Sequence, residues 1–507
     1  MAGTIPDLFD AAVERAPTKV WLQFEDSRYT FEEAHAHIAA AAARLSDLGV
    51  QHEMLVVATM RNSPAYLFTW LGLMRLGAVL VPANPRSSAA ELAGLAAQVR
   101  PAAVVTDSEL AGDFEQNQAR IVPVEELEGY EPAGMPPSAA RPADIAVMIP
   151  TSGTTGRSKL VMQTQRAYSM AGEGFPFWLG LTERDRLMTS LPLFHINAPA
   201  YSVLGSVAAG AGLVLLPRFS GAGFIASARR YGATEFNAIG AMLEILMRRP
   251  ERDDDADNPL RLCYTGPSPT KERQLEIEHR FGLEIVCGYA LSETPYALIW
   301  RKGTRPFGTL GSTRQHPTLG EINRARVMDE GREVSPGEEG ELELSNPAVM
   351  LGYYDMPDET RAVLSGEWLK TGDLVRVNSD GTYTFVARKK EVIRRRGENL
   401  SPLDVEAALE DHPAVVEAAV VGVPSDLTEE DVKAFVVLEQ HASASLVDLR
   451  DHAATALAAY KVPRYFESVS ELPHTPTGRI AKHELPRERT ESEEDFGARA
   501  EAGADQG

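Results

Sequence analysis

This chain has little cysteine and no long apolar run. Its 507 residues include only two cysteines, Cys263 and Cys287. Two cysteines form no disulfide framework and suit a reducing compartment. The longest apolar run, Leu204 to Pro217, is short and rich in alanine and glycine, which indicates buried core rather than a membrane span. No basic and then apolar segment opens the chain, so we expect a cytoplasmic protein without a membrane partner.

Positive charge is also scarce. The formal net charge is −22, and lysine supplies only 10 of the 50 basic residues. A chain this acidic lacks the basic surface that binds a nucleic-acid backbone, so we expect no nucleic-acid partner. Its 44% hydrophobic and 24% charged residues are typical of a soluble globular enzyme. The length predicts about two to four structural units.

The first part of the chain alternates helices with short apolar strands. Such alternation is typical of a parallel sheet with helices on its faces. The predicted fold class is therefore α/β, with a large N-terminal domain of parallel-sheet and helix layers. The apolar period predicts helices over Thr30–Leu48, Ala65–Leu76, Ser88–Gln98 and Arg166–Leu179, and strands over Leu55–Ala58, Ala78–Pro82, Ala102–Val105, Arg186–Leu191 and Leu213–Leu216.

The pattern changes after residue 305, where short strands are separated by turns. Gly340–Leu344 and Tyr383–Val386 are two of these strands, and Asp380-Gly381 is typical of a hairpin turn. They predict a small β-barrel-like part. A further helix opens at Ser401-Pro402, with serine as its N-cap. We expect an N-terminal domain over residues 1–387, a hinge at 388–390, a small mobile α+β domain over 391–489 and a disordered acidic tail over 490–507.

The segment from Thr151 to Lys159 is the most informative stretch of the sequence. It reads Thr-Ser-Gly-Thr-Thr-Gly-Arg-Ser-Lys and follows the apolar residues 146–149. Backbone N–H groups and hydroxyls in such a loop bind an anion, and Lys159 adds a mobile positive charge. The glycine spacing is not that of a P-loop. A flexible Ser/Thr/Gly linker is the alternative interpretation of this segment alone.

Five further segments decide between these interpretations. Each is weak alone, because a single loop histidine, glutamate or Thr-Gly-Asp turn is more often structural. They are Leu191–His195, Gly288–Glu293, Trp368–Asp373, Arg388–Leu400 and Leu472–Ile480. Together and in this order they resemble the adenylate-forming acyl-CoA synthetases, which are related to luciferases and nonribosomal peptide adenylation domains. The resemblance extends through about Leu485, and Ile393–Asn399 is most similar to bacterial carnitine and medium-chain acyl-CoA ligases.

The resemblance implies a reaction in two steps. A carboxylate attacks the α-phosphate of ATP to give acyl-AMP and pyrophosphate, and the thiol of coenzyme A then displaces AMP. The implied cofactors are ATP, or the AMP moiety of an acyl-adenylate, together with Mg²⁺ and coenzyme A. Because the first step joins two anions, cations and oriented donors must offset their repulsion.

The resemblance also assigns residues to the nucleotide. Lys159 is the charge of the pyrophosphate loop, and the Glu293 carboxylate suits a hard octahedral ion such as Mg²⁺. Tyr289 stacks on adenine, Asp373 accepts the ribose hydroxyls and Arg388 contacts the ribose or a phosphate. The full implied nucleotide- and phosphate-binding set is Thr151, Ser152, Gly153, Thr154, Thr155, Lys159, Gly266, Pro267, Ser268, Tyr289, Ser292, Asp373 and Arg388.

The implied catalytic residues are His195, Glu293, Lys390 and Arg479. His195 matches a gate between the acyl pocket and the path of the thiol, with a solvated loop histidine as the alternative. Lys390 lies at the hinge of a domain rotation. Gly397 matches the glycine that narrows the CoA tunnel. Arg394 to Arg396 either hold CoA phosphates or form ordinary surface charge.

The implied acyl pocket has small residues. Its predicted members are Asn237, Gly240, Ala241 and Ala290, and Gly266 is expected to leave further room. A roomy apolar pocket predicts a medium-length or bulky hydrophobic carboxylic acid as substrate, compatible with secondary metabolism or with fatty acids.

The sequence departs from the family pattern at the residues of the first step. Arg479 stands where the family has a lysine that supports adenylation. Arginine is a wide planar fork and lysine a compact point charge, so the exchange is not conservative. Ser158 and Leu160 replace a proline and a glycine beside Lys159, and the leucine is expected to add bulk beside the phosphates.

These departures leave more than one function open. The favoured interpretation is an enzyme that forms acyl-CoA from an acyl-adenylate made by a separate adenylating enzyme, its own adenylation being weakened or lost. A complete two-step ligase is the main alternative, with Arg479 or Lys482 supplying the charge. An amide-forming synthetase and an inactive binding protein are further alternatives. We expect a monomer or a homodimer.

Overall fold

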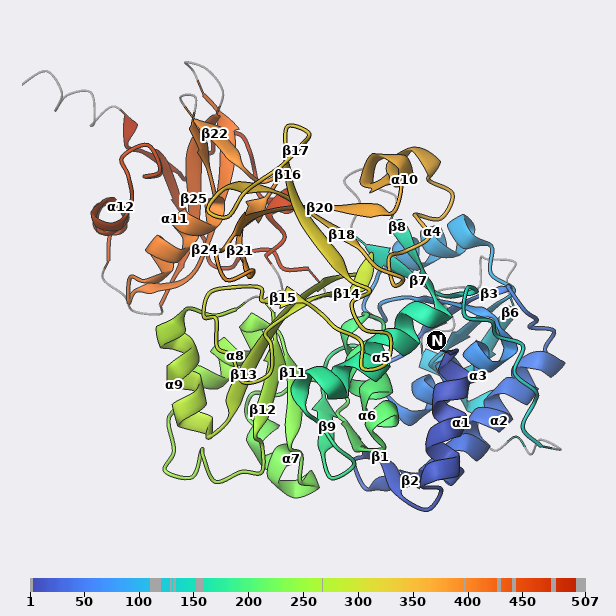
Figure 1. Ribbon diagram of the computed structural model, residues 1–507. Helices are drawn as coiled ribbons and strands as arrows, with labels where there is room; N and C mark the ends of the chain where they lie inside the picture. The colour runs from blue at the N-terminus through green and yellow to red at the C-terminus, as the bar shows by residue number, and fades with distance from the viewer. Residues whose placement is uncertain are drawn as a thin grey trace, which may run out of the picture. The chain divides into compact units, whose positions relative to one another are not determined.

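The chain divides into two compact units, each with its own hydrophobic core (Figure 1). The structure is a computed structural model that describes residues 3–109, 120–127, 130, 134–151, 158–266, 268–395, 398–425, 430–439, 444–475 and 480–497. The first unit comprises residues 1–326, 343–371 and 379–383, and the second comprises 327–342, 372–378 and 384–507.

The first unit contains two large sheets. The nine-stranded sheet has the order β15 (Ser312–Thr313), β14 (Thr294–Ile299), β13 (Glu284–Leu291), β12 (Leu262–Thr265), β11 (Glu235–Ala238), β9 (Arg186–Thr189), β10 (Gly212–Leu215), β1 (Val20–Phe24), β2 (Ser27–Thr30). The six-stranded sheet has the order β6 (Arg120–Pro123), β5 (Ala103–Thr106), β3 (Leu55–Thr59), β4 (Val79–Pro82), β7 (Ile145–Thr151), β8 (Lys159–Thr164). Both are mainly parallel, with antiparallel pairs at β1–β2, β13–β14–β15 and β7–β8.

Helices cover the faces of both sheets. Val57 and Val104 of the six-stranded sheet pack with α4, whereas Val56 and Val105, which alternate with them, belong to the core of the helices between the sheets. Opposite faces of one sheet are therefore both buried, as a parallel sheet requires. The helices are α1 (Ile5–Arg15), α2 (Phe31–Asp47), α3 (Pro64–Leu76), α4 (Ala89–Val99), α5 (Gln165–Leu179), α6 (Leu204–Ala209), α7 (Phe224–Tyr231), α8 (Gly240–Met247), α9 (Lys271–Phe281) and α10 (Pro357–Val363), with the short η2 (Val124–Glu126) and the π-helix η3 (Ala198–Val203).

The layers follow from local sequence signals and long-range contacts. Thr30 and Glu33 form a capping box that starts α2, and Ser88 and Glu91 start α4 in the same way.

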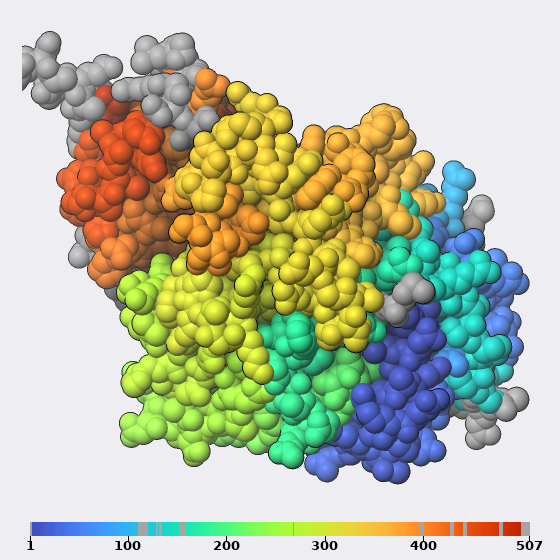
Figure 2. Space-filling model, viewed as in Figure 1, coloured from blue at the N-terminus to red at the C-terminus, as the bar shows by residue number. Residues whose placement is uncertain are grey.

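Helices α8 and α9 lie on one side of the nine-stranded sheet, and α5 and α6 lie on the other (Figure 1). On the face drawn in Figure 2 the dark blue surface of α1 adjoins that of α5, where the Ile5 N–H donates to the Gln165 side chain (3.1 Å).

A third sheet carries the short strands expected after residue 305. The strand order of this sheet is β17 (Arg332–Glu333), β16 (Arg324–Asp329), β18 (Glu339–Ser345), β20 (Trp368–Val377), β19 (Leu364–Ser365). Strand β21 (Tyr383–Arg388) also pairs with β20. The expected turn at Asp380-Gly381 joins β20 to β21. The chain passes between the two units within β16, β18, β20 and β21, and once more directly after β20.

The second unit has an α+β core. Strands β24 (Val415–Pro424), β25 (Glu430–Leu438), β26 (Tyr465–Ser468) and β27 (Glu494–Asp495) form a mixed sheet in this order. Helices α11 (Pro402–Glu410) and α12 (Leu446–Ala456) pack against each other, and the buried Val405 and Leu449 join a cluster with Phe466 of the sheet. The small hairpin of β22 (Ile393–Arg395) and β23 (Glu398–Leu400) and the short η4 (Lys482–Glu484) complete the described elements.

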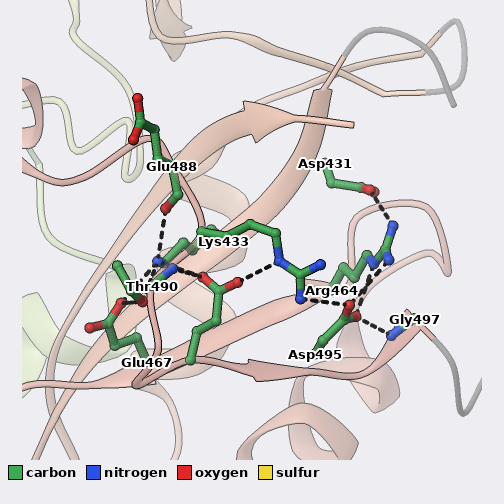
Figure 3. Close-up of polar contacts among 10 residues, drawn as sticks. Asp431, Lys433, Arg464, Glu467, Glu488, Thr490, Asp495 and Gly497 are labelled. Atoms are coloured by element: carbon green, nitrogen blue, oxygen red, sulfur yellow. Dashed lines mark hydrogen bonds and ion pairs between the residues drawn. The ribbon is translucent and has the colours of Figure 1, made fainter. Parts of the chain in front are cut away.

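The C-terminal segment differs from its prediction. Residues 490–497, expected to be disordered, carry β27 and bury Phe496, which is 4% exposed. Arg464 bonds to Asp495 (2.9 Å), as Figure 3 shows. Lys433 bonds to Glu493 (2.7 Å), so acidic residues hold this segment to the sheet. Residues 498–507 lie outside the described residues.

Other sequence predictions are confirmed with one change in detail. The α/β class, the alternating strands and helices of the first unit, and the buried run from Leu204 are all present. Ser401 precedes α11 as predicted, but its hydroxyl donates to the Val386 carbonyl (2.7 Å) and does not cap the helix. None of the described helices is long and apolar enough to cross a membrane.

Candidate functional site

The Thr/Gly segment is the loop of a β-hairpin in the first unit. Strand β7 ends at Thr151, which stands opposite Lys159 at the start of β8. The Thr151 hydroxyl donates to the Lys159 carbonyl (3.2 Å) and closes the hairpin at that point. Ser152, Gly153, Thr154 and Thr155 lie outside the described residues. The strand predicted before the segment is therefore present, and a second strand, paired with it, follows the segment.

Leu160 does not face this loop. Its side chain is fully buried and packs with Val57, Val104 and Met148 against α4. Because side chains alternate along a strand, Leu160 points away from the face that Lys159 occupies. The expectation that its bulk lies beside the phosphates is wrong, and the core accommodates the leucine.

Glu293 lies at the tip of a tight hairpin. Leu291 pairs with Thr294, so Ser292 and Glu293 form a two-residue turn between β13 and β14. The buried Gln163 of β8 donates to the Ser292 carbonyl (2.7 Å) and ties this turn to the strand that begins at Lys159.

Tyr353 connects Glu293 to Lys159 and was not predicted from the sequence. Its hydroxyl donates to Glu293 Oε1 (2.8 Å), and the Lys159 ammonium lies 4.8 Å from the centre of its ring. A carboxylate and an ammonium are thus held on either side of one aromatic residue. The sequence signal that marks the place is the Gly352-Tyr353 pair, because glycine permits the φ of +139° and the close approach of Thr360.

These residues fit the ions that the resemblance implies. Glu293 is half-buried, and the Tyr353 hydroxyl orients one of its carboxylate oxygens, Oε1. Such a carboxylate suits Mg²⁺, which keeps several waters and takes one or two protein oxygens. Mg²⁺ held there would neutralise phosphate oxygens, and Lys159 would add a second positive charge.

His195 follows a loop that a buried asparagine holds in place. Leu193 N–H donates to Asn62 Oδ1 (3.0 Å), and Asn62 Nδ2 donates to the carbonyls of Leu191 (3.0 Å) and Leu216 (3.2 Å). Both N–H donors of this buried amide and one acceptor site of its oxygen are used, and two of the three bonds go to the loop. His195 itself is half-buried, with its ring centre 4.5 Å from that of Phe194. Asn62 was also missed, because it lies 131 residues before Leu193.

The predicted acyl-pocket residues lie at the ends of β11 and β13. Asn237, fully buried, donates to the side chain of Asn197 (2.7 Å), two residues after His195. A β-carbon at Gly240 would meet no atom within 4 Å, which agrees with the room predicted there. Ala241 and Ala290 are half-buried.

Gly266 has a different role from the one expected. A β-carbon there would lie 2.4 Å from the Gly288 carbonyl oxygen, so the glycine permits close contact between β12 and β13 rather than leaving room for substrate. Ser268 is half-buried and its hydroxyl donates to the Pro269 carbonyl (3.2 Å), whereas Pro267 lies outside the described residues.

Tyr289 is anchored from behind by a buried arginine. Arg314 is 1% exposed and contacts the Tyr289 carbonyl (3.5 Å) and the hydroxyls of Tyr201 (2.9 Å) and Tyr264. The Tyr289 side chain is half-buried on β13. This arginine was not predicted, since its contacts join five segments that are distant in sequence.

In the second unit the structure brings Asp373 and Arg388 together. Asp373 is buried, and Arg388 Nε lies 2.8 Å from its Oδ1. Glu341 supports the same strand end: it accepts the Gly372 N–H (3.1 Å) and pairs with Lys389 (2.8 Å). Two groups assigned to the ribose and phosphate therefore lie side by side. Lys390 is exposed in the turn that follows β21.

The remaining predicted residues are not described. Gly397 and Arg479 lie outside the described residues, and so does Arg396. Lys482, the other cation of the Arg479 segment, is described. Its ammonium lies 2.6 Å from the Glu406 carboxylate, which is 7% exposed. Burial raises the pKa of Glu406, and the charge of Lys482 opposes that rise.

Comparisons with known proteins identify the family of the chain. The family model described as "AMP-binding enzyme" matches residues 9–354, and that described as "AMP-binding enzyme C-terminal domain" matches residues 404–479. A crotonobetaine/carnitine–CoA ligase of Salmonella arizonae is 28% identical over 91% of this chain and 93% of its own. A sulfoacetate–CoA ligase of Cupriavidus necator is 30% identical over 96% and 99%.

A solved structure matches along nearly the whole chain. The O-succinylbenzoate coenzyme A synthetase of Bacillus subtilis in complex with AMP is 26% identical, with a TM-score of 0.86 over 96% of this chain and 99% of its own. The same enzyme has been solved with ATP and a magnesium ion, with a TM-score of 0.85. The chain therefore belongs to the family of AMP-binding enzymes, and within it to the adenylate-forming acid–thiol ligases.

Proposed function

We propose that this ligase forms an acyl-CoA thioester from an acyl-adenylate and coenzyme A, and that its own adenylation step is weakened. In thioester formation the CoA sulfur bonds to the acyl carbon and the bond from that carbon to the AMP oxygen breaks. AMP leaves with the electron pair, and the thiol proton is released to solvent or a base. The complete two-step synthesis of acyl-CoA is the second candidate, because the relatives carry the names of CoA ligases.

The ion pair between Lys482 and Glu406 carries the proposal. A family lysine is replaced by Arg479, and Lys482 is the nearest cation that could take its place. Its ammonium is 2.6 Å from a buried carboxylate whose other contact is the Val420 N–H (2.6 Å). Removing Lys482 from this pair would leave a buried charge unpaired, which is costly. Arg479 must therefore supply the charge itself, with a shape that suits the task less well.

The groups assigned to AMP support the retained step. The buried Asp373 forms an ion pair with the half-buried Arg388 in the second unit, so the two groups assigned to the ribose and phosphate are held together. The lysine-to-arginine exchange at Arg479 would affect the joining of two anions more than the release of AMP, because only the first step joins them.

The substrate class remains a medium-length or bulky hydrophobic acid. The open space at Gly240 supports this size, and the amide pair of Asn237 and Asn197 offers one polar contact. A separate adenylating enzyme is then the natural supplier of the acyl-adenylate.

A paired assay tests the proposal. One arm supplies a panel of hydrophobic acids with ATP, Mg²⁺ and CoA, and the other supplies the matching acyl-adenylates with CoA. We expect thioester at least about tenfold faster in the second arm. We expect Arg479→Lys to raise the rate of thioester formation in the first arm by about 10- to 100-fold, which is the effect typical of one charge-stabilising group.

Two controls make the result specific. Arg487→Lys is the same exchange at an exposed position of the same unit, and it should change neither arm. Equal rates in both arms of the parent enzyme would overturn the proposal and establish a complete ligase. Loss of adenylation in Lys482→Met would then identify Lys482 as the source of the charge.

A further inference from the structure

Tyr353 lies where three backbone segments meet. Leu351 N–H donates to the Met162 carbonyl (3.0 Å) and Tyr354 N–H to the Leu160 carbonyl (2.9 Å), so this segment pairs with β8. Met350 N–H donates to the Glu293 carbonyl (2.8 Å). Backbone bonds thus place residue 353 between the strand that begins with Lys159 and the turn that carries Glu293.

Successive side chains of this segment point to opposite sides. Tyr353, 7% exposed, contacts Glu293 through its hydroxyl and Lys159 through its ring. Tyr354 packs instead against the cluster that contains Leu160 and α4. Tyr353 therefore contacts the residues of the candidate site, whereas Tyr354 contacts the core on the other side.

We propose that Tyr353 is a positioning residue with two separable functions. Its hydroxyl orients the Glu293 carboxylate toward Mg²⁺, and its ring holds the Lys159 ammonium toward the phosphates. The inference rests on the proposed function, because it takes Glu293 and Lys159 as the groups that meet the metal and the pyrophosphate.

The chemistry of the two contacts explains why they can be separated. A hydrogen bond to a carboxylate is directional and fixes the remaining oxygen for a ligand. The ring attracts an ammonium through its π face, and a phenylalanine ring keeps that attraction. Tyr353→Phe therefore removes only the bond to Glu293, whereas Tyr353→Leu removes both contacts.

Metal and nucleotide binding provide the first test. Mn²⁺ binding in the presence of a non-hydrolysable ATP analogue is followed by electron paramagnetic resonance, and binding of the Mg²⁺ complex of the analogue by calorimetry. We expect Tyr353→Phe to weaken Mn²⁺ binding about 5- to 20-fold. We expect Tyr353→Leu to weaken binding of the ATP analogue further, by at least about threefold, because Lys159 is then no longer held.

Matched variants at the neighbouring tyrosine serve as controls. Tyr354→Phe and Tyr354→Leu make the same changes on the core side, and both should retain the parent affinities for Mn²⁺ and the analogue. The rate of thioester formation from acyl-adenylate and CoA should stay near the parent value in both Tyr354 variants, because Tyr354 packs on the core side. Adenylation, measured in the Arg479→Lys background, should need about 5- to 20-fold more Mg²⁺.

The outcomes distinguish this inference from the proposed function. Unchanged Mn²⁺ and analogue binding in both Tyr353 variants would overturn the positioning function, whatever the paired assay shows. Equal weakening in the Tyr353 and Tyr354 variants would also overturn it, because the effect would then be structural. A complete ligase in the paired assay would leave these binding measurements valid.

Discussion

Arg314 is a buried cation whose described partners are all uncharged. Its guanidinium donates to the Tyr201 hydroxyl (2.9 Å), the Tyr264 hydroxyl and the Pro295 carbonyl (2.9 Å), and it lies 4.5 Å from the Trp178 ring centre. Burial works against its charge, but the two tyrosine hydroxyls hold the pKa of Arg314 above its ordinary value. Buried charges are usually paired, so oriented dipoles and ring faces must replace a carboxylate here.

Removing this arginine should be costly. In Arg314→Met the two tyrosine hydroxyls and the strand carbonyls lose their donors, and we expect a loss of at least about 3 kcal/mol in the free energy of unfolding of the first unit. Tyr264→Phe removes one of these bonds and should cost about 1–2 kcal/mol. All five tryptophans lie in the first unit, so fluorescence during urea unfolding measures both effects. Arg184→Met, at a 91% exposed side chain, should be neutral, and an equally small loss in Arg314→Met would contradict this account.

At the scale of elements, the contact between β12 and β13 depends on a glycine, Gly266, which has no side chain. Gly266 lies so close to the Gly288 carbonyl that an added β-carbon would be 2.4 Å from the oxygen. A backbone atom cannot move aside cheaply, so the two strand ends would have to separate. These strand ends precede Ser268 and Tyr289, two residues assigned to the nucleotide.

Alanine at this position therefore tests the packing. We expect Gly266→Ala to cost about 1–3 kcal/mol in the free energy of unfolding and to weaken binding of AMP, measured by calorimetry. Gly240→Ala adds the same methyl group where no atom lies within 4 Å, and stability should change by less than about 0.5 kcal/mol. If both variants lost the same stability, close contact of the strands would not be the reason.

The elements that the sequence predicted are those with local signals. The apolar period and the caps define α2 and α4, and the Thr/Gly segment does form the loop between two strands. Asp373 and Arg388, assigned from motifs, do meet. Such signals involve neighbouring residues, so one sequence suffices to see them.

The residues that were missed depend on the tertiary fold. Tyr353 contacts Glu293 across 60 residues of sequence, and Asn62 contacts Leu193 across 131. No period or spacing links such residues before the sheets are assembled. Residues 490–497 were assigned to disorder because they have few apolar anchors, but ion pairs with Lys433 and Arg464 and the single anchor Phe496 hold them.

At the scale of the whole molecule, a network of charges adds to the hydrophobic core of the second unit and links its sheet to the C-terminal segment. Lys433, with a side chain that is 0% exposed, pairs with Glu467 (2.9 Å), as Figure 3 shows, and with Glu493 (2.7 Å). Arg464 joins Asp431 to Asp495 (both 2.9 Å) and so links two strands to the C-terminal segment. These contacts connect β25, β26 and β27, which lie far apart in the sequence.

The carboxylates of this network give the second unit a defined response to acid. The bond to Arg464 holds the pKa of Asp495 below its usual value. Burial alone would raise the pKa of Glu493 and Glu467, but Lys433 and nearby hydroxyl or backbone donors hold both below the usual value. Groups with a lowered pKa in the folded state stabilise it above their unfolded pKa of about 4, and this stability is lost as the pH falls through the folded values. We therefore expect the second unit to be stable from neutral pH to about pH 5 and to weaken below about pH 4.

Lys433→Met should reverse the pH dependence of the stability of the second unit. Without the ammonium, Glu467 and Glu493 are buried carboxylates with less compensation, so their pKa rises and the protonated form is favoured in the folded state. We expect a loss of about 3–5 kcal/mol in the free energy of unfolding of the second unit at pH 7 and a smaller loss at pH 5, where protonation relieves the unpaired charges.

Hydrogen exchange of peptides from β25 and β26, corrected for the intrinsic rate at each pH, measures the stability of this unit, which has no tryptophan. Lys461→Met removes a more exposed pair with Asp404 and should cost less than about 1 kcal/mol at either pH. A Lys433→Met protein whose second unit is weaker at pH 5 than at pH 7 would show that the carboxylates do not depend on this lysine.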